Sequence, residues 1–189
     1  MDHHQNMLKK ESEDIITVDD MDRETGHMEK LEVHKRGILH RAFSVMIFNH
    51  EGEVLLQKRA KEKYHSPGLW SNACCSHQRV GETLAEAVSR GLLEELGIIC
   101  HCREVFQFQY RVEFDNSLIE HEIDHVFFDQ YDGKVLPNKE EVEEIQWIEL
   151  DKLSEDMKEH PERYTYWFRI MMEQTEIRSL EKLVLGGKE

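Results

Sequence analysis

Residues 76–98 read SHQRVGETLAEAVSRGLLEELGI, and the part from Thr83 to Leu96 predicts the clearest helix of the chain. Thr83 with Glu86 three residues later forms a capping box, in which each side chain satisfies a backbone N–H that the helix leaves free. Gly97 is well placed to end the helix, because glycine adopts left-handed backbone angles at little cost. At ~100° per residue, one stripe of this helix carries Leu84, Ala87, Val88, Leu92 and Leu96.

Glu95 falls inside this apolar stripe. A carboxylate on the core side of a helix is costly unless it is paired or binds a metal ion. The periodicity alone leaves two interpretations open with equal weight. Glu95 either accepts hydrogen bonds from Arg59 or from backbone amides, or it is a metal ligand.

Much of the remaining chain predicts strands. The expected strands are residues 14–18, 41–48, 54–57, 105–114, 118–128 and 144–150. Gly52 lies between two of them and predicts a hairpin, while residues 60–69 lack periodicity and predict a loop. Two further helices are expected at residues 151–159 and 161–183. Strands interspersed with helices and linked mostly by hairpins predict an α/β (α+β) fold, with helices covering a mixed sheet.

The length of 189 residues suits one domain, expected at residues 14–189 after a flexible tail at residues 1–13. The chain has 24 Lys and Arg against 39 Asp and Glu, a formal charge of −15. Such a charge argues against nucleic acid or an anionic membrane surface as partner, and an anionic substrate would need local cations or metals. Both a monomer and a homodimer remain open.

No apolar run approaches the ~20 residues of a membrane span, and the first residues lack the apolar centre of a secretory signal, so we expect a cytoplasmic protein. The four cysteines lack the spaced framework of small secreted domains, so reduced thiols are expected. The stretch Cys100-His101-Cys102 offers half a zinc site but has no matching second pair, and core packing is favoured there.

In the strand expected at residues 118–128, alternation places Glu120 and Glu122 on one face, with Cβ atoms ~7 Å apart. Like charges at that spacing raise each other's pKa unless a cation lies between them, which suits a metal site or a proton donor. A solvated strand face is the ordinary alternative. His34, His40 and His77 also have ordinary alternatives, since the chain contains 12 histidines. Imidazoles with carboxylates suit a transition metal, whereas carboxylates alone suit magnesium.

Residues 76–98 resemble the Nudix box, a loop and helix that bind magnesium diphosphate. The residues that match this pattern are Glu82, Arg90, Leu92, Glu94, Glu95, Gly97 and Ile98. Ser76 replaces the opening glycine, and Gly91 replaces the glutamate that usually follows the arginine. The resemblance implies a Nudix-like mixed sheet sandwiched between α-helices. The loss of one carboxylate implies weakened hydrolysis.

Most of the chain resembles the type I isopentenyl diphosphate isomerases, a branch of the Nudix superfamily that moves a double bond. The matching segments, in order, are MEKLEVH (28–34), LHRAF (39–43), PGLWSNACCSH (67–77), FQYR (108–111), EHEID (120–124) and YWF (166–168). Several independent blocks in the right order are more specific than any single motif. The resemblance implies reversible conversion of isopentenyl diphosphate to dimethylallyl diphosphate in isoprenoid biosynthesis, through a tertiary carbocation.

The resemblance also implies roles for individual residues. One divalent metal, zinc, manganese or magnesium, would be held by His34, His40, His77, Glu120 and Glu122. Glu95 would hold a Mg²⁺ that bridges to the diphosphate, which would also contact Lys30, Arg59 and Lys63. Glu122 with Tyr110 would protonate the alkene, Cys75 would accept a proton on the opposite face, and Trp167 would stabilise the cation. The acid and base assignments of Cys75 and Glu122 are open to exchange.

Each of these assignments has a rival. Cys75 is also a small residue suited to burial, and Trp167 is suited to packing the terminal helix on the sheet. Two other functions remain open for the whole chain. One is a Nudix pyrophosphohydrolase acting on a nucleotide or another diphosphate, and the other is a metal- or diphosphate-binding module without catalysis. Gly91 and Cys75 count against the hydrolase, and the pairing of Cys75 with Glu122 counts against the binding module.

Overall fold

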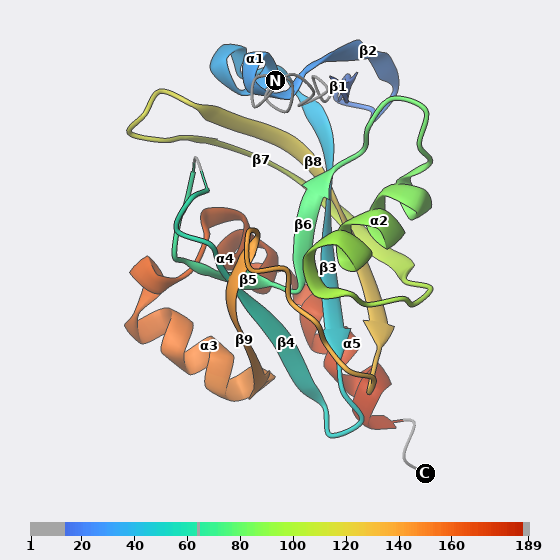
Figure 1. Cartoon of the computed structure of the whole chain (residues 1–189), viewed down its shortest axis with the longest axis vertical. Coiled ribbons are helices and arrows are strands. Elements are labelled where there is room, and N and C mark those ends of the chain that lie inside the picture. The colour runs from blue at the N-terminus through green and yellow to red at the C-terminus, as the bar shows by residue number, and fades with distance from the viewer. Residues whose placement is uncertain (1–13, 64, 187–189) are drawn as a thin grey trace, which may run out of the picture.

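The computed structural model describes residues 14–63 and 65–186, so the tail predicted at residues 1–13 lies outside the described part. The elements in order are β1 (Asp14–Val18), β2 (Glu24–Glu29), α1 (Lys30–Arg36), β3 (His40–Phe48), β4 (Glu53–Arg59), β5 (Trp70–Asn72), β6 (Cys74–His77), α2 (Leu84–Leu96), β7 (Arg103–Glu113), β8 (Ile119–Gln130), β9 (Val142–Glu149), α3 (Leu150–Glu159), the 3₁₀ turn η1 (Pro161–Arg163), α4 (Tyr166–Glu173) and α5 (Thr175–Gly186) (Figure 1).

Strand β3 organises the sheet. It pairs in parallel with β8 and antiparallel with β1, β4 and β6, while β7 pairs antiparallel with β8. Strand β4 carries β5 and β9 as antiparallel neighbours. The sheet is therefore mixed, as predicted. Because β3 is buried on both faces, its sequence is almost continuously apolar from Ala42 to Phe48.

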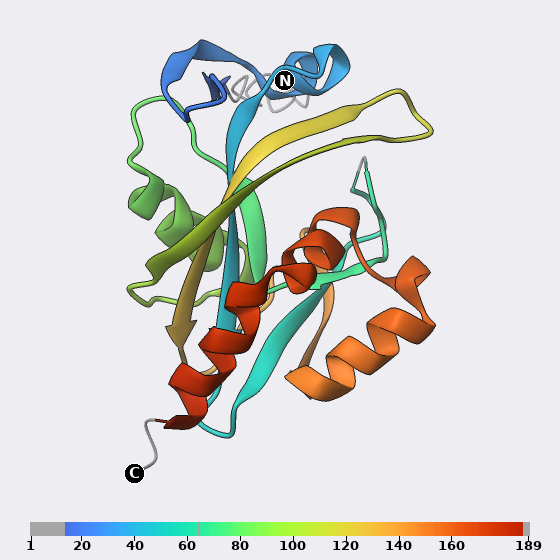
Figure 2. The ribbon, with the colours of Figure 1, turned by 180° about the vertical axis from the view of Figure 1, so that it is seen from behind.

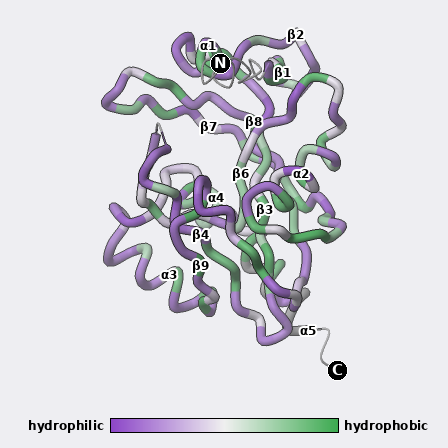
Figure 3. The backbone as a smooth tube through the Cα atoms, in the orientation of Figure 1, coloured by the Kyte–Doolittle hydropathy of each residue, from purple (hydrophilic) through white to green (hydrophobic). Residues whose placement is uncertain are grey.

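Two apolar clusters cover the two faces of the sheet. Alternate residues of β3 divide between them, with Val45 and Ile47 in the cluster under α2, and Met46 and Phe48 in the cluster under α3, α4 and α5. Figures 1 and 2 show α2 on one side of the sheet and α4 with α5 on the other. Figure 3 shows hydrophobic stretches along β3 and β4. The predicted α/β (α+β) class, a mixed sheet sandwiched between helices, is confirmed.

The helix predicted from the capping box is confirmed. Thr83 is the N-cap of α2, its hydroxyl accepts from the Glu86 N–H, and the Glu86 carboxylate accepts from the Thr83 N–H. Gly97 ends the helix with a φ of 64°. The predicted stripe is the buried face: Ala87, Val88, Leu92 and Leu96 are almost fully covered.

The prediction of one helix over residues 161–183 is wrong. The chain forms η1, α4 and α5, separated by extended backbone at Tyr164, Thr165 and Gln174. Tertiary contacts outweigh local helix propensity at the first break, since the Thr165 N–H donates to the Trp70 carbonyl at 2.9 Å. The break lets α4 start beside β5, where the Trp167 indole N–H reaches the Ser71 hydroxyl.

Four short elements went unpredicted: β2, α1, β5 and β6. They span three to seven residues each, which is too short for a clear periodicity. Among the described residues, no helix is both long and apolar enough to cross a membrane.

Candidate active site

A cavity of about 600 Å³ opens beside the sheet. Its walls carry all four predicted acid, base and cation-stabilising groups: Cys75 from β6, Tyr110 from β7, Glu122 from β8 and Trp167 from α4. The residues predicted to contact diphosphate, Lys30, Arg59 and Lys63, line the same cavity, as does Glu95. The fold thus brings groups that are far apart in sequence into one enclosure.

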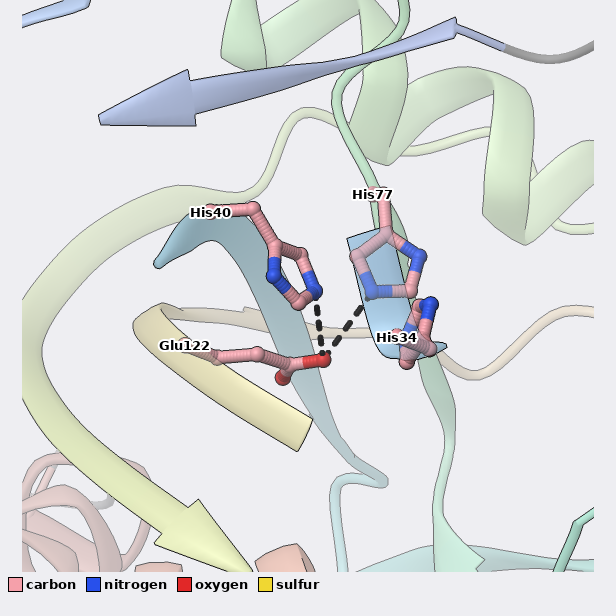
Figure 4. Close-up of side chains that lie close together, drawn as sticks. All are labelled: His34, His40, His77 and Glu122. Atoms are coloured by element: carbon pink, nitrogen blue, oxygen red, sulfur yellow. Dashed lines mark hydrogen bonds and ion pairs between the residues drawn. The ribbon is translucent and has the colours of Figure 1, made fainter. Parts of the chain in front are cut away.

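Three histidines and one glutamate form a cluster next to this cavity (Figure 4). His34 lies on α1, His40 on β3, His77 on β6 and Glu122 on β8, and their ligand atoms lie within 4.8 Å of one another. Strand register brings them together, because β3 pairs His40 with Glu122 and the nearby Ala42 with His77. The ring centroids of the three imidazoles are 4.9–5.3 Å apart.

Hydrogen bonds orient two of these rings. His34 Nδ1 lies 2.6 Å from the Lys30 carbonyl and His40 Nδ1 lies 2.8 Å from the Ile38 carbonyl. A carbonyl only accepts, so both Nδ1 atoms carry protons, and the neutral ring of His34 then presents the lone pair of Nε2 to the cluster. His40 Nε2 faces Glu122 Oε1 at 3.2 Å, and His34 Nε2 is buried with no hydrogen-bond partner.

The protonation states of this cluster are those of metal ligands. Burial lowers the pKa of His34, and it lowers the pKa of His77 to about 3, so both rings are neutral at pH 7. Burial alone would raise the pKa of Glu122, but hydrogen bonds with His40 and His77 outweigh it and hold that pKa well below its usual range. Neutral imidazoles converging with an ionised carboxylate fit a divalent cation.

Glu120 lies beside this group but outside the four ligands that converge within 4.8 Å. The Tyr110 hydroxyl is 3.0 Å from Glu120 Oε2 and 2.7 Å from Glu122 Oε2, so the phenol bridges the two carboxylates. Burial, and then the charge of Glu122, raises the pKa of Glu120 well above its usual range. Neither glutamate lies on a solvated strand face, because both are about 95% covered.

Cys75 lines the cavity, whereas its neighbour Cys74 is fully buried under α2. The two side chains take opposite faces because they are adjacent on strand β6. Cys75 Sγ lies 3.9 Å from the Ser71 hydroxyl. Burial raises the pKa of Cys75 to about 12, so this thiol carries its proton at neutral pH.

Trp167 both packs and lines the cavity. It belongs to the apolar cluster under α4, and only 3% of it is exposed. Its indole N–H donates to the Ser71 hydroxyl at 3.1 Å, and the Arg59 guanidinium lies over the ring at 5.2 Å from the centroid. A cation at this distance from an indole ring is attracted by its π face.

Glu95 accepts a 2.7 Å hydrogen bond from the Gln57 side chain. Of the two interpretations left open by the sequence, the hydrogen-bonded one holds with a different partner, because strand β4 presents Gln57 to the carboxyl end of α2. Glu95 nevertheless remains half-buried at the cavity wall. Lys63, another wall residue, forms an ion pair with Glu141.

The Gly91 departure has a steric cause. A Cβ atom at this position would lie 2.9 Å from Cys74 Sγ and 3.1 Å from Phe43 Cζ. Position 91 faces the apolar cluster between α2 and the sheet, so a glutamate fits only if those neighbours shift.

Three further residues escaped sequence reasoning: His65 and Asp124 line the cavity, and Ser71 lies behind two of its wall residues. Ser71 contacts both Cys75 and Trp167, and His65 lies 5.7 Å from Trp167 between ring centroids. Asp124 is 1% exposed, accepts from the Ser44 hydroxyl at 2.7 Å and has its pKa raised by burial. Alternation along β8 places Asp124 on the face of Glu120 and Glu122, and this signal was sufficient to find it.

Comparison with known proteins defines the class first. Residues 38–168 match the family model of the NUDIX domain. The MutT NUDIX hydrolase from Burkholderia pseudomallei superposes with a TM-score of 0.58 at 24% identity, covering 72% of this chain and 98% of that one, which supports the fold.

Closer relatives define the branch. Isopentenyl-diphosphate Delta-isomerase 2 from Aromatoleum aromaticum is 45% identical over 81% of this chain and 81% of its own length. Isopentenyl-diphosphate Delta-isomerase from Burkholderia multivorans is 45% identical over 90% of this chain and 97% of its own length. This chain belongs to the isopentenyl-diphosphate Delta-isomerase family of the NUDIX-domain proteins.

Proposed function

We propose that this protein interconverts isopentenyl diphosphate and dimethylallyl diphosphate and so acts in isoprenoid biosynthesis. One observation carries the proposal beyond family membership. A thiol at Cys75 and a carboxylate–phenol pair at Glu122 and Tyr110 line the same cavity as the indole of Trp167. This set suits proton transfer to and from a hydrocarbon better than attack by water on a diphosphate.

The reaction requires a proton to be added at one carbon of an unactivated alkene and another proton to be removed from a second carbon. The intermediate is a tertiary carbocation, which water would trap. Trp167 supplies a buried π face to stabilise this charge, and its indole N–H is fixed by Ser71. Tyr110 and Glu122 are themselves only 6% and 5% exposed, which limits the contact of these two groups with bulk water.

Protonation states in the ligand-free protein support an order for the two transfers. The pKa of Cys75, raised to about 12 by burial, keeps the thiol protonated at neutral pH, so we assign it the proton that isopentenyl diphosphate receives. The pKa of Glu122, held low by its hydrogen bonds, leaves this carboxylate ionised and able to accept a proton, and the Tyr110 hydroxyl at 2.7 Å completes the path. In this order Cys75 is the acid and Glu122 the base, the opposite of the roles implied by the resemblance. In the reverse reaction each group takes the other role.

Divalent metals complete the proposed site. His34, His40, His77 and Glu122 would hold a zinc, manganese or magnesium ion, with Glu120 as a further ligand, and such an ion would fix and polarise the carboxylates. Glu95 would hold a Mg²⁺ at the diphosphate. Lys30, Arg59 and Lys63 would bind the diphosphate itself and offset the repulsion from a chain of charge −15.

Proton NMR in deuterated water tests the function directly. Reduced protein, isopentenyl diphosphate and Mg²⁺ are combined, and dimethylallyl signals, deuterium uptake and phosphate release are followed together. We expect the isomer with incorporated deuterium and no released phosphate. Phosphate or pyrophosphate without isomer would overturn the proposal in favour of a hydrolase, and the absence of both products would leave a binding role in its place.

A further inference from the structure

A second group of metal-ligating side chains lies away from the cavity. Cys100 and Cys102 approach each other to 3.6 Å between sulfur atoms, and the carboxylate of Asp129 joins them. The three ligand atoms lie within 4.8 Å of one another. None of these residues lines the cavity, and the reaction proposed above makes no use of them.

The fold creates this group at the edge of the sheet. Cys100 and Cys102 lie in the segment between α2 and β7, and Asp129 lies near the end of β8. The start of β7 pairs with the end of β8 through Arg103 and Phe128, so the two cysteines are carried to the aspartate. Residues 98–102 form no strand, and this irregular backbone lets alternate side chains converge where a strand would hold their Cβ atoms ~7 Å apart.

Core packing explains only part of this arrangement. Cys100 and Cys102 pack against the apolar cluster under α2, as predicted, yet both side chains and Asp129 remain half-exposed. Both thiols are free. Their partial exposure distinguishes these three side chains from Cys74, which packs in the same apolar cluster and is fully buried.

We propose that Cys100, Cys102 and Asp129 bind a thiophilic divalent cation of the zinc class. In a tetrahedral site with Zn–S bonds of ~2.3 Å, two cysteine sulfurs lie ~3.8 Å apart, close to the separation in this structure. Two thiolates favour soft cations over magnesium or calcium. With three protein ligands, a fourth position stays open to water or another small ligand.

Charge accounts for how such an ion is retained. Two thiolates and one carboxylate supply three negative charges, of which a divalent cation neutralises two. The metal must displace thiol protons, so its affinity rises with pH.

Cadmium is the probe for the thiolates, since a Cd²⁺–thiolate bond absorbs in the ultraviolet. The background is Cys75→Ser, which removes the thiol of the cavity, and the protein is kept reduced with a phosphine. Titration of the Cys75→Ser protein with Cd²⁺ should give a thiolate absorption band. This band should be lost when Cys100→Ser and Cys102→Ser are added to the same protein. Equilibrium dialysis with Zn²⁺ should show one bound ion fewer in that variant. The proposal is overturned if the band and the number of bound ions persist.

Two controls separate this site from other effects. Asp129→Asn should weaken the binding of Cd²⁺ but keep the thiolate band at saturation. Cys74→Ala should change neither the Cd²⁺ affinity nor the thiolate band. A measurement on the unaltered chain covers the case in which the double variant fails to fold. Zn²⁺ should slow alkylation of Cys100 and Cys102 by iodoacetamide roughly tenfold or more, as followed by peptide mass spectrometry. Equal alkylation rates with and without Zn²⁺ would also overturn the proposal.

Discussion

The Tyr110 hydroxyl donates a 2.7 Å hydrogen bond to Oε2 of Glu122. The other oxygen of the same carboxylate, Oε1, faces His40 at 3.2 Å and His77 at 3.0 Å. One side chain therefore belongs both to the imidazole cluster and to the proton-transfer side of the cavity. Because the two functions share Glu122, a change in metal occupancy is expected to change proton transfer as well.

Replacement of Cys75 tests the proton donor. Cys75→Ala should lower kcat by at least ~10²-fold, the usual contribution of a positioned acid or base, and leave the fold intact. Cys74→Ala is the matched control, because it removes the adjacent thiol from the opposite face of β6 and should retain turnover. Isomerisation by NMR gives the rate. Full activity of Cys75→Ala would exclude a catalytic role for this thiol.

Replacement of His77 tests the metal cluster. His77→Ala removes one of four converging ligands and should weaken Mn²⁺ binding at least ~10-fold at pH 7. Mn²⁺ is the probe because thiolates select it poorly, so the group at Cys100 does not interfere. Electron paramagnetic resonance counts free ions. His50→Ala is the control on an exposed histidine, and equal losses in both variants would contradict the assignment.

Glu95 is expected to act through Mg²⁺. Glu95→Gln keeps an oxygen for the Gln57 hydrogen bond but lowers the ligand charge, so it should abolish the gain in isopentenyl diphosphate affinity that Mg²⁺ provides. Calorimetric titration with and without Mg²⁺ measures this difference. The exposed Glu86 on the same helix supplies the control variant Glu86→Gln, which should bind as the parent does. An unchanged Mg²⁺ effect in Glu95→Gln would rule out this ligand.

Replacement of Gly91 tests whether packing accounts for the glycine at this position, where the Nudix box usually has a glutamate. Gly→Ala within a helix normally stabilises by ~1 kcal/mol, but here the added methyl meets Cys74 Sγ at 2.9 Å. We expect Gly91→Ala to destabilise the protein by ~1–2 kcal/mol, and Cys74→Ala in the same chain to relieve that loss. Urea unfolding of the four members of this cycle gives the coupling energy. Additive effects would show that the two positions do not compete for space.

Acid should destabilise the metal-free protein through buried histidines. Burial lowers the pKa of His65 to about 2 and that of His77 to about 3, below the ~6.5 of an unfolded histidine. Below pH ~6.5 the unfolded chain then binds more protons than the folded one, so stability falls as the pH drops.

The variant that tests this dependence is His65→Phe, which keeps the aromatic contacts with Phe114 and Trp167. It should reduce the slope of unfolding free energy against pH by up to ~1.4 kcal/mol per unit between about pH 6 and pH 4. Urea unfolding at several pH values measures the slope. The control His50→Phe replaces an exposed histidine and should leave the slope unchanged. If His65→Phe also has the slope of the unaltered protein, the assignment of a neutral buried ring to His65 is refuted.

Local signals in the sequence were enough for the parts of the fold that depend on neighbouring residues. The capping box at Thr83 and the glycine at 97 predicted α2, because caps and a 3.6-residue period act within a few turns. The long strands and the mixed sheet followed from alternation and the hairpin at Gly52. The resemblance then supplied the residues of the cavity, since its segments keep their order along the chain.

Only the tertiary structure decided how these residues meet. The register of β3 with β6 and β8 brings His40, His77 and Glu122 together, and sequence spacing carries no information about register between distant strands. Contact of Thr165 with Trp70 broke a stretch that was locally helical, and so positioned Trp167. Gln57 became the hydrogen-bond partner of Glu95, and Cys74 and Phe43 leave little room for a side chain at position 91. These outcomes depend on long-range contacts, which form only when the whole sheet assembles.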